Sequence, residues 1–170
     1  MVRTSRLVAL GTAVVFVVGL TACGSSDGND ADVAKDSGTA AAPCRPVGGD
    51  LKSTGVKTVP IELKEYSFTP STVDVAAGVV TFAVTNAGTE NHEMAVLPGG
   101  GDVPLTAAGK PDEDALTAAG AFELEAFGKG LSCEATFDLK PGTYTLFCIV
   151  TDPDGLTHYQ KGMRGKLTVA

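Results

Sequence analysis

The stretch PGTYTLFCIVTDPDGLTHYQKGMRGKLTV, residues 141–169, decides the fold and holds most of the candidate donor atoms of this chain. A Pro-Gly turn leads into TYTLFC, where Tyr144, Leu146 and Cys148 share one face of a strand because side chains alternate with a period of two. With Leu146 in the core, Cys148 points inward at the end of the strand, which is a rigid place for a metal ligand. Residues 165–169 predict the last strand.

The same alternation runs through the rest of the folded part, which we expect to be one domain over residues 56–170. Strands are expected within 56–68 and over 71–75, 79–86, 93–97, 134–139, 143–148 and 165–169. Short strands separated by Gly and Pro turns indicate an all-β antiparallel sandwich or barrel. Residues 99–130 fit this pattern less well, and we expect a variable insertion with a helical turn or two over 112–119 and a strand near Phe122 and Leu124.

The N-terminus is typical of an export signal. Arg3 and Arg6 precede an apolar run that ends in Leu-Thr-Ala-Cys at Cys23. This ending resembles the bacterial lipobox, which implies a lipoprotein signal peptide over residues 1–22, cleavage before Cys23 and a diacylglycerol on its sulfur. The protein would then be exported and lipid-anchored on the extracytoplasmic face of the cell membrane. The alternative is an ordinary signal peptide followed by an incidental cysteine.

Composition narrows the possible partners. Without Arg3 and Arg6, 11 of the 13 basic residues remain against 20 acidic ones, a formal charge of −9. This acidic balance argues against nucleic acid and against an anionic membrane surface. Residues 23–55 are rich in Gly, Ser, Asp and Ala, so we expect a flexible acidic tether, of which the section from Cys44 begins to pack.

The soft donor atoms are few and close in sequence. The chain has only two histidines, His92 and His158, and Cys148 and Met163 flank the second of them. Taken singly, a buried cysteine, histidine or methionine is more often structural than functional. Together, two imidazoles, a thiolate and a weak axial thioether form the donor set of a blue-copper electron-transfer site. Met94 is a competing thioether, but its place in a strand favours the core.

These segments resemble the cupredoxin family, which includes plastocyanin and azurin. The matching stretches are SFTPSTVDVAAGVVTFAVTN, TNAGTENHEMAVL and PGTYTLFC…HYQKGMRGKLTV. The resemblance implies a Greek-key β-sandwich, one type 1 copper per chain and one-electron transfer to a redox protein partner. Carried over position by position, it implies copper ligands at His92, Cys148, His158 and Met163, with His158 near the surface as the residue that passes the electron.

Two features depart from the plastocyanin pattern. Nine residues separate Cys148 from His158, which makes a longer loop than that of plastocyanin. Glu93 follows the first histidine, where plastocyanin and azurin have an asparagine that ties the two ligand loops together. The tie between these loops must therefore differ in this chain.

Other polar residues have structural interpretations. Cys44 and Cys133 remain once lipid and metal are assigned, and outside the cytoplasm such a pair tends to form a disulfide. The Tyr144 hydroxyl is expected to bond nearby backbone as a tyrosine corner. The segment Asp152-Pro153-Asp154-Gly155 resembles part of a calcium loop, but the rest of that motif is missing and the segment favours a solvated turn.

The sequence therefore predicts a non-enzymatic protein, because we find no candidate catalytic acid, base or nucleophile. The first hypothesis is a lipid-anchored electron carrier, expected to be a monomer. The second is a copper-binding lipoprotein for copper supply or tolerance, with the same ligands and no redox role. A third is a domain that keeps the fold without copper.

Overall fold

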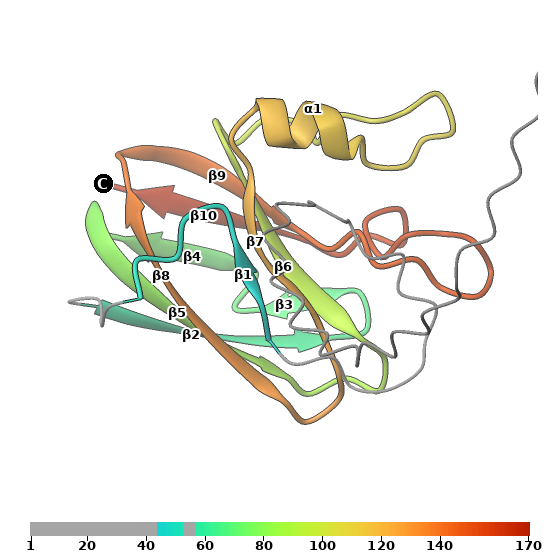
Figure 1. Ribbon diagram of the computed structural model, residues 1–170, viewed down its shortest axis with the longest axis horizontal. Helices are drawn as coiled ribbons and strands as arrows, with labels where there is room; N and C mark the ends of the chain where they lie inside the picture. The colour runs from blue at the N-terminus through green and yellow to red at the C-terminus, as the bar shows by residue number, and fades with distance from the viewer. Residues whose placement is uncertain (1–43, 53–56) are drawn as a thin grey trace, which may run out of the picture. The chain divides into compact units, whose positions relative to one another are not determined.

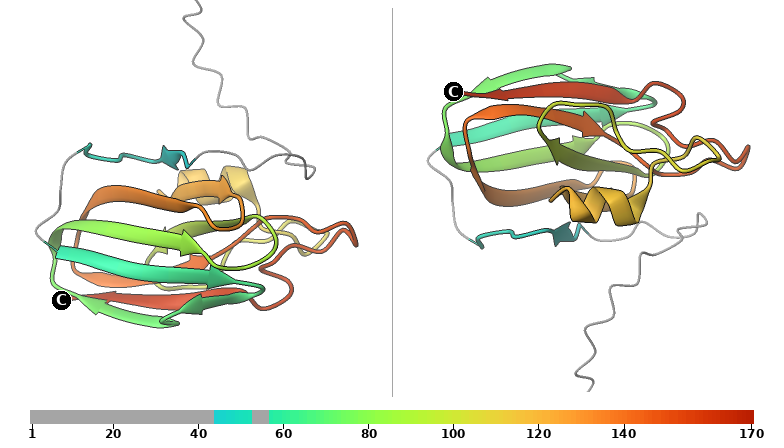
Figure 2. Two further views of the ribbon diagram at one scale, coloured as in Figure 1. Left: turned by 90° about the horizontal axis from the view of Figure 1, so that it is seen from below. Right: turned by 90° about the horizontal axis from the view of Figure 1, so that it is seen from above.

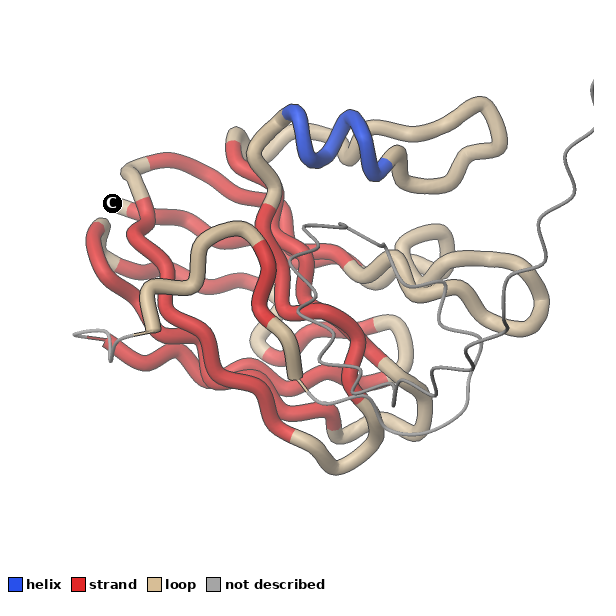
Figure 3. Tube along the Cα trace, viewed as in Figure 1, coloured by secondary structure: helices blue, strands red, loops and turns tan. Residues whose placement is uncertain are grey.

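The computed structural model describes residues 44–52 and 57–170. Within these ranges the regular secondary structure consists of strands and one short helix, joined by loops (Figures 1 and 3). The predicted signal peptide, Cys23 and the other tether residues, 24–43 and 53–55, lie outside the described residues. The all-β fold predicted from the alternation of side chains is confirmed.

The strands form two sheets. The elements are β1 (Pro46–Val47), β2 (Lys57–Lys64), β3 (Ser67–Thr69), β4 (Thr72–Val75), β5 (Gly78–Asn86), β6 (His92–Pro98), α1 (Glu113–Ala118), β7 (Phe122–Phe127), β8 (Ser132–Leu139), β9 (Gly142–Phe147) and β10 (Arg164–Val169). One sheet has the order β1-β7-β6-β9-β10-β4 and the other β3-β2-β5-β8. Two neighbouring pairs, β2 with β5 and β4 with β10, are parallel, so the sandwich is not purely antiparallel as the sequence had suggested.

The main core fills the space between the sheets. In β2, every second residue from Val59 to Leu63 is buried, and in β5 Val80, Phe82 and Val84 are buried together. Their partners in β9 and β10 include Leu146 and Leu167. The period of two that predicted these strands is therefore the period that builds the core.

The insertion after β6 forms a second, smaller core on the outer face of the six-stranded sheet, which contains β6. Strand β6 is buried along its length up to Leu97, because Met94 and Val96 face the main core while Ala95 and Leu97 face the other way. Val103, Leu116, Phe147 and Tyr159 pack with these two. The expected helical turn is α1, which begins after Asp112, whose side chain accepts a hydrogen bond from the Ala115 amide.

A disulfide joins the start of the described chain to the second sheet. Cys44 and Cys133 are bonded, with their α-carbons 5.1 Å apart, which confirms the predicted pair. Pro46 and Val47 pair with β7, and the Leu51 amide donates to the Thr136 carbonyl. Residues 44–52 are thus packed against the sandwich.

The Tyr144 hydroxyl closes the turn that precedes its own strand. It donates to the Lys140 carbonyl at 2.8 Å and accepts from the Lys140 amide at 3.1 Å. This is the predicted tyrosine corner. Its place at the opposite end of β9 from Cys148 leaves the tyrosine outside the site described below.

Four chain segments meet at one end of the sandwich. There β5 ends, β6 begins, β9 ends and β10 begins, and the long connection from residue 148 to residue 163 extends past the strand ends (Figures 1 and 2). Side chains placed on these strand ends have rigid bases. Among the described residues, no helix is long and apolar enough to cross a membrane.

Candidate metal centre

Three donor atoms meet at this end of the sandwich. The His158 Nδ1 atom lies 3.0 Å from the His92 Nδ1 atom and 3.3 Å from the Cys148 Sγ atom. All three side chains are fully buried. His92 opens β6, Cys148 directly follows β9, and His158 belongs to the long connection before β10. The structure thus brings together three of the four side chains that the sequence pointed to.

Asn86 and Glu65 fix the loop that carries His92. The Asn86 side chain is buried and donates to the carbonyls of Glu90 and Phe127, while its oxygen accepts from the Gly88 amide. The Glu65 carboxylate accepts from the Thr89 amide and hydroxyl and from the Glu90 amide. Bonds from backbone Thr89 outweigh burial and lower the pKa of Glu65 to about 2, so the carboxylate stays charged.

Glu93 supplies the tie between the histidine strand and the cysteine loop. Its amide points at the Cys148 Sγ atom at 3.5 Å, and its Oε1 atom accepts from the Ile149 amide at 2.7 Å. The carboxyl is buried, and burial together with the charge of Glu123 raises its pKa well above the usual value. The Glu93 side chain therefore joins the histidine strand to the cysteine loop by accepting a hydrogen bond from the Ile149 backbone. This is the different tie that the sequence predicted.

The connection between Cys148 and His158 folds as a small hairpin. Thr151 and Thr157 form an isolated β-bridge, and the Asp152 amide donates to the Leu156 carbonyl. The His158 amide then donates to Val150. The interpretation of residues 152–155 as a solvated turn is wrong for Asp152, which is only 8% exposed, because its side chain turns inward toward His158.

His158 does not lie at the surface, contrary to expectation. Its ring is fully buried, with the Tyr66 ring at its edge, 5.2 Å between centroids and 74° between planes. Its Nε2 atom is 2.9 Å from the Asp152 Oδ1 atom and 3.4 Å from the Glu90 Oε2 atom. The longer loop explains the difference, because it folds back over the histidine.

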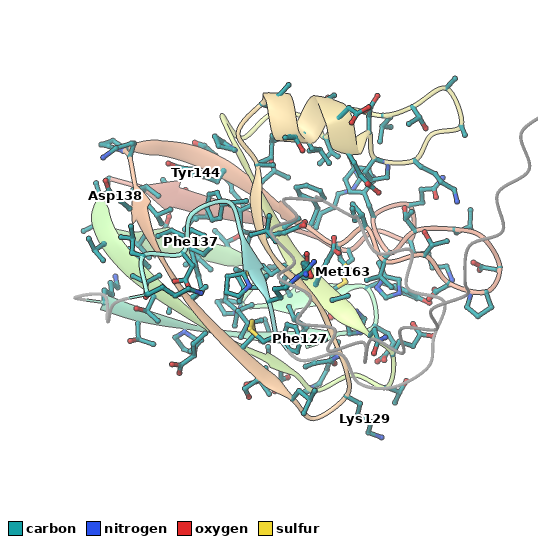
Figure 4. All side chains as sticks on the ribbon, in the orientation of Figure 1. Phe127, Lys129, Phe137, Asp138, Tyr144 and Met163 are labelled. Carbon is teal, nitrogen blue, oxygen red and sulfur yellow. A yellow bond between two sulfur atoms is a disulfide. The ribbon has the colours of Figure 1, made fainter. Side chains whose placement is uncertain are left out.

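Both methionines near the site are buried in the main core. Met163 follows the turn after His158, and its amide donates to the His158 carbonyl at 2.9 Å. Figure 4 shows its side chain inside the sandwich, near the end from which the long connection emerges, and Tyr144 further toward the other end. Met94 lies within β6 and packs in the same core, as its position predicted.

Burial favours the uncharged forms of His92 and Cys148 in the metal-free site. Burial, with a smaller contribution from His158, lowers the pKa of His92 to about 4, so its imidazole is neutral and keeps a free lone pair at pH 7. Burial, followed by the charge of Glu93, raises the pKa of the Cys148 thiol well above its usual value. Metal binding must then release that proton.

The donor set itself indicates which metal fits. Two imidazole nitrogens and one sulfur converge here, and Met163 lies in the same buried core as Cys148. These residue types are the donor set that holds copper in blue-copper proteins. A structural zinc site of the usual kind would need a fourth strong ligand. The second converging group, Glu90, Asp152 and His158, shares the same histidine and is not independent of this centre.

The chain belongs to the copper binding proteins of the plastocyanin/azurin family, whose pattern matches residues 56–170. It is therefore a cupredoxin, and copper is its cofactor. This confirms the resemblance seen in the sequence and the Greek-key sandwich that it implied.

Solved structures agree with this assignment. Auracyanin B is 27% identical and superimposes with a TM-score of 0.59 over 74% of this chain and 97% of its own. Dithionite-reduced auracyanin from the photosynthetic bacterium Roseiflexus castenholzii is 28% identical, with a TM-score of 0.52 over 69% of this chain and 99% of its own. Comparison with curated protein sequences gives no match.

Sequence reasoning missed the residues that surround the donors. The sequence places Asp152 in a turn and both Tyr66 and Asn86 in strands, and it indicates no role for them at the site. The unusual length of the loop after Cys148 was the one available hint of Asp152, since a longer loop needs internal partners. No pattern in the sequence points to Tyr66, which is 86 positions from its hydrogen-bond partner Asp152.

A substitution at Gly88 tests whether the loop next to His92 keeps the imidazole ring in place for copper binding. A β-carbon at this position would lie 2.7 Å from both the His92 Nε2 atom and the Glu65 Oε1 atom, so the ring has to move. We expect Gly88→Ala to weaken copper(II) binding by about tenfold, or about 1.4 kcal/mol. Competition titration against a chelator measures the change.

Gly101→Ala is the matched control, because a β-carbon there meets nothing within 4 Å. Equal copper affinity in the two variants would contradict the contact argument.

Proposed function

We propose that this protein is a lipid-anchored, extracytoplasmic blue copper protein that carries single electrons between redox partners. His92, Cys148 and His158 would hold the copper, with Met163 as a further, weaker ligand. The observation that carries this proposal is the convergence of the three donor atoms within 4.8 Å in a fully buried site.

Bound copper supplies the one-electron chemistry, by alternating between Cu(II) and Cu(I). The protein's part is to hold the ligands still. Strands β6 and β9 anchor two donors, Glu93 ties their segments together, and the hairpin fixes the third donor. Because the donors are positioned before any metal arrives, little rearrangement is needed when the charge of the site changes.

Burial supports electron transfer over copper supply. A protein that hands copper to a partner has to expose its ligands, whereas His92, Cys148 and His158 are all closed to solvent. An electron can cross a thin protein layer without any opening of the site. The dithionite-reduced form of the R. castenholzii auracyanin, a similar protein, also supports a redox role.

The place of action is proposed from the N-terminus. The apolar run before Cys23 and the small residues beside it support lipid attachment. Stable anchoring by lipid needs more than one chain, which diacylglycerol provides. We propose a monomer that meets an unidentified redox protein at the outer face of the cell membrane.

The purified domain with Cu(II) should be intensely blue and bind one copper per chain. Cys148→Ser should abolish the colour, because the thiolate supplies the charge-transfer absorption. Visible spectroscopy during a copper titration measures both. A blue serine variant would contradict the ligand assignment, and rapid loss of copper to a mild chelator would favour copper supply instead.

Met163→Leu should keep the blue colour and raise the reduction potential. The thioether donates some charge that favours the oxidised site, and leucine removes this donation while three strong ligands stay. Voltammetry measures the shift. Met94→Leu is the matched control, since it makes the same change in the same core. If Met94→Leu shifts the potential and Met163→Leu does not, the axial assignment has to be exchanged.

Cys23→Ser should move the protein from the membrane fraction to the soluble extracytoplasmic fraction. A single sulfur would carry the proposed lipid, so its loss removes the anchor. Fractionation and immunoblotting of the full chain measure the distribution. Membrane association that persists in this variant would refute the lipobox interpretation.

A further inference from the structure

The outward nitrogen of His158 is enclosed by a hydrogen-bonded group from three segments. Its Nε2 atom is 2.9 Å from the Asp152 Oδ1 atom. The Asp152 Oδ2 atom accepts from the Tyr66 hydroxyl at 2.8 Å and from the Lys161 ammonium. Lys161 also donates to the Tyr66 hydroxyl, at 3.2 Å. Both carboxylate oxygens of Asp152 are therefore occupied: Oδ1 faces His158, and Oδ2 faces Tyr66 and Lys161.

The chemistry of Asp152 decides which nitrogen of His158 carries the proton. The Lys161 ammonium and the Tyr66 hydroxyl both donate to the Asp152 Oδ2 atom, so the carboxylate is paired with a positive charge. An ionised carboxylate can only accept, so the Nε2 atom must be the donor. In a neutral imidazole the lone pair then lies on Nδ1, the atom that faces His92 and Cys148.

Tyr66 contacts both the His158 ring and the Lys161 side chain. Tyr66 has a positive φ of 61°, a backbone conformation that a bulky residue adopts only when its surroundings hold it. Its ring packs against the His158 ring, and the Lys161 nitrogen lies 5.0 Å from the Tyr66 ring centroid. Lys161 also pairs with Asp154 at 2.8 Å, which joins the group to the hairpin.

We propose that Asp152 is a positioning residue of the copper centre, which holds His158 through its Nε2–H, presents Nδ1 to the metal and closes the ring from solvent together with Tyr66 and Lys161. This inference rests on the proposed function for the metal, but its first consequence concerns the metal-free protein. Carboxylate partners of metal-bound histidines fix the tautomer and the ring orientation and raise the basicity of the ligand. Here the partner comes from the additional length of the ligand loop.

The metal-free protein provides the first test. Nitrogen-15 NMR at about pH 8, where free imidazole is neutral, reports which nitrogen of His158 is protonated. We expect the Nε2–H form in the unmodified protein and in Asp154→Ala, and a mixture of both forms in Asp152→Ala. Asp154→Ala is the matched control, because it removes a carboxylate from the same hairpin that contacts Lys161 and not His158. A proton on Nδ1 in the unmodified protein would overturn the proposal.

Copper provides the second test. Asp152→Ala should lower copper affinity by about 10- to 100-fold relative to Asp154→Ala. Asp152→Asn keeps an acceptor oxygen and removes the negative charge, so it should retain the Nε2–H form yet raise the reduction potential. Equal affinity in the two alanine variants would overturn the proposal. Failure of the unmodified protein to bind copper would refute the proposed function, while the NMR result would still decide the role of Asp152.

The asparagine variant also covers the case in which Asp152→Ala does not fold. It has almost the same size as the native side chain, and circular dichroism checks its fold. If its reduction potential equals that of Asp154→Ala, the negative charge beside His158 does not act on the copper centre and the proposal fails. A higher potential in Asp152→Asn alone supports it.

Discussion

Three buried donor atoms from distant parts of the chain have to meet within a few ångströms, and this requirement organises the rest of the structure. An imidazole or a thiol gains nothing from burial unless it finds a partner. Strand ends solve the problem, because the ladders of β6 and β9 hold His92 and Cys148 at fixed places. The packing of the two sheets thus places the ends of several strands next to one another.

Each donor segment is held by a polar side chain from elsewhere. Asn86 closes the loop before the first histidine, Glu93 joins that strand to the cysteine loop, and Asp152 holds the second histidine. Two of these three are carboxyl groups, in a chain with formal charge −7. Of the two, Asp152 is paired with the Lys161 ammonium, whereas burial raises the pKa of Glu93.

The insertion between β6 and β7 has a structural role that its composition concealed. Gly, Ala and acidic residues over 99–121 gave no clear alternation, yet Val103 and Leu116 cover the outer face of β6. Tyr159, the neighbour of His158, packs in the same small core against Phe147, with ring centroids 6.2 Å apart. The insertion therefore supports the histidine loop from outside, at a position that no local pattern reveals.

The sequence by itself determined the strands, their inward faces, the disulfide pair and the family, because a period of two is local and because scarce donor residues occur in a recognisable order. For Cys148, the inward direction followed from Leu146 alone, because the two side chains lie on the same face of a strand. Only the tertiary structure decided that two strand pairs are parallel, that Glu93 ties the ligand segments and that Asp152 and Tyr66 bury His158. These outcomes depend on contacts between residues far apart in sequence, such as Thr72 and Lys166, which are 94 positions apart. Their geometry is set by the packing of the sheets and not by any neighbour in the chain.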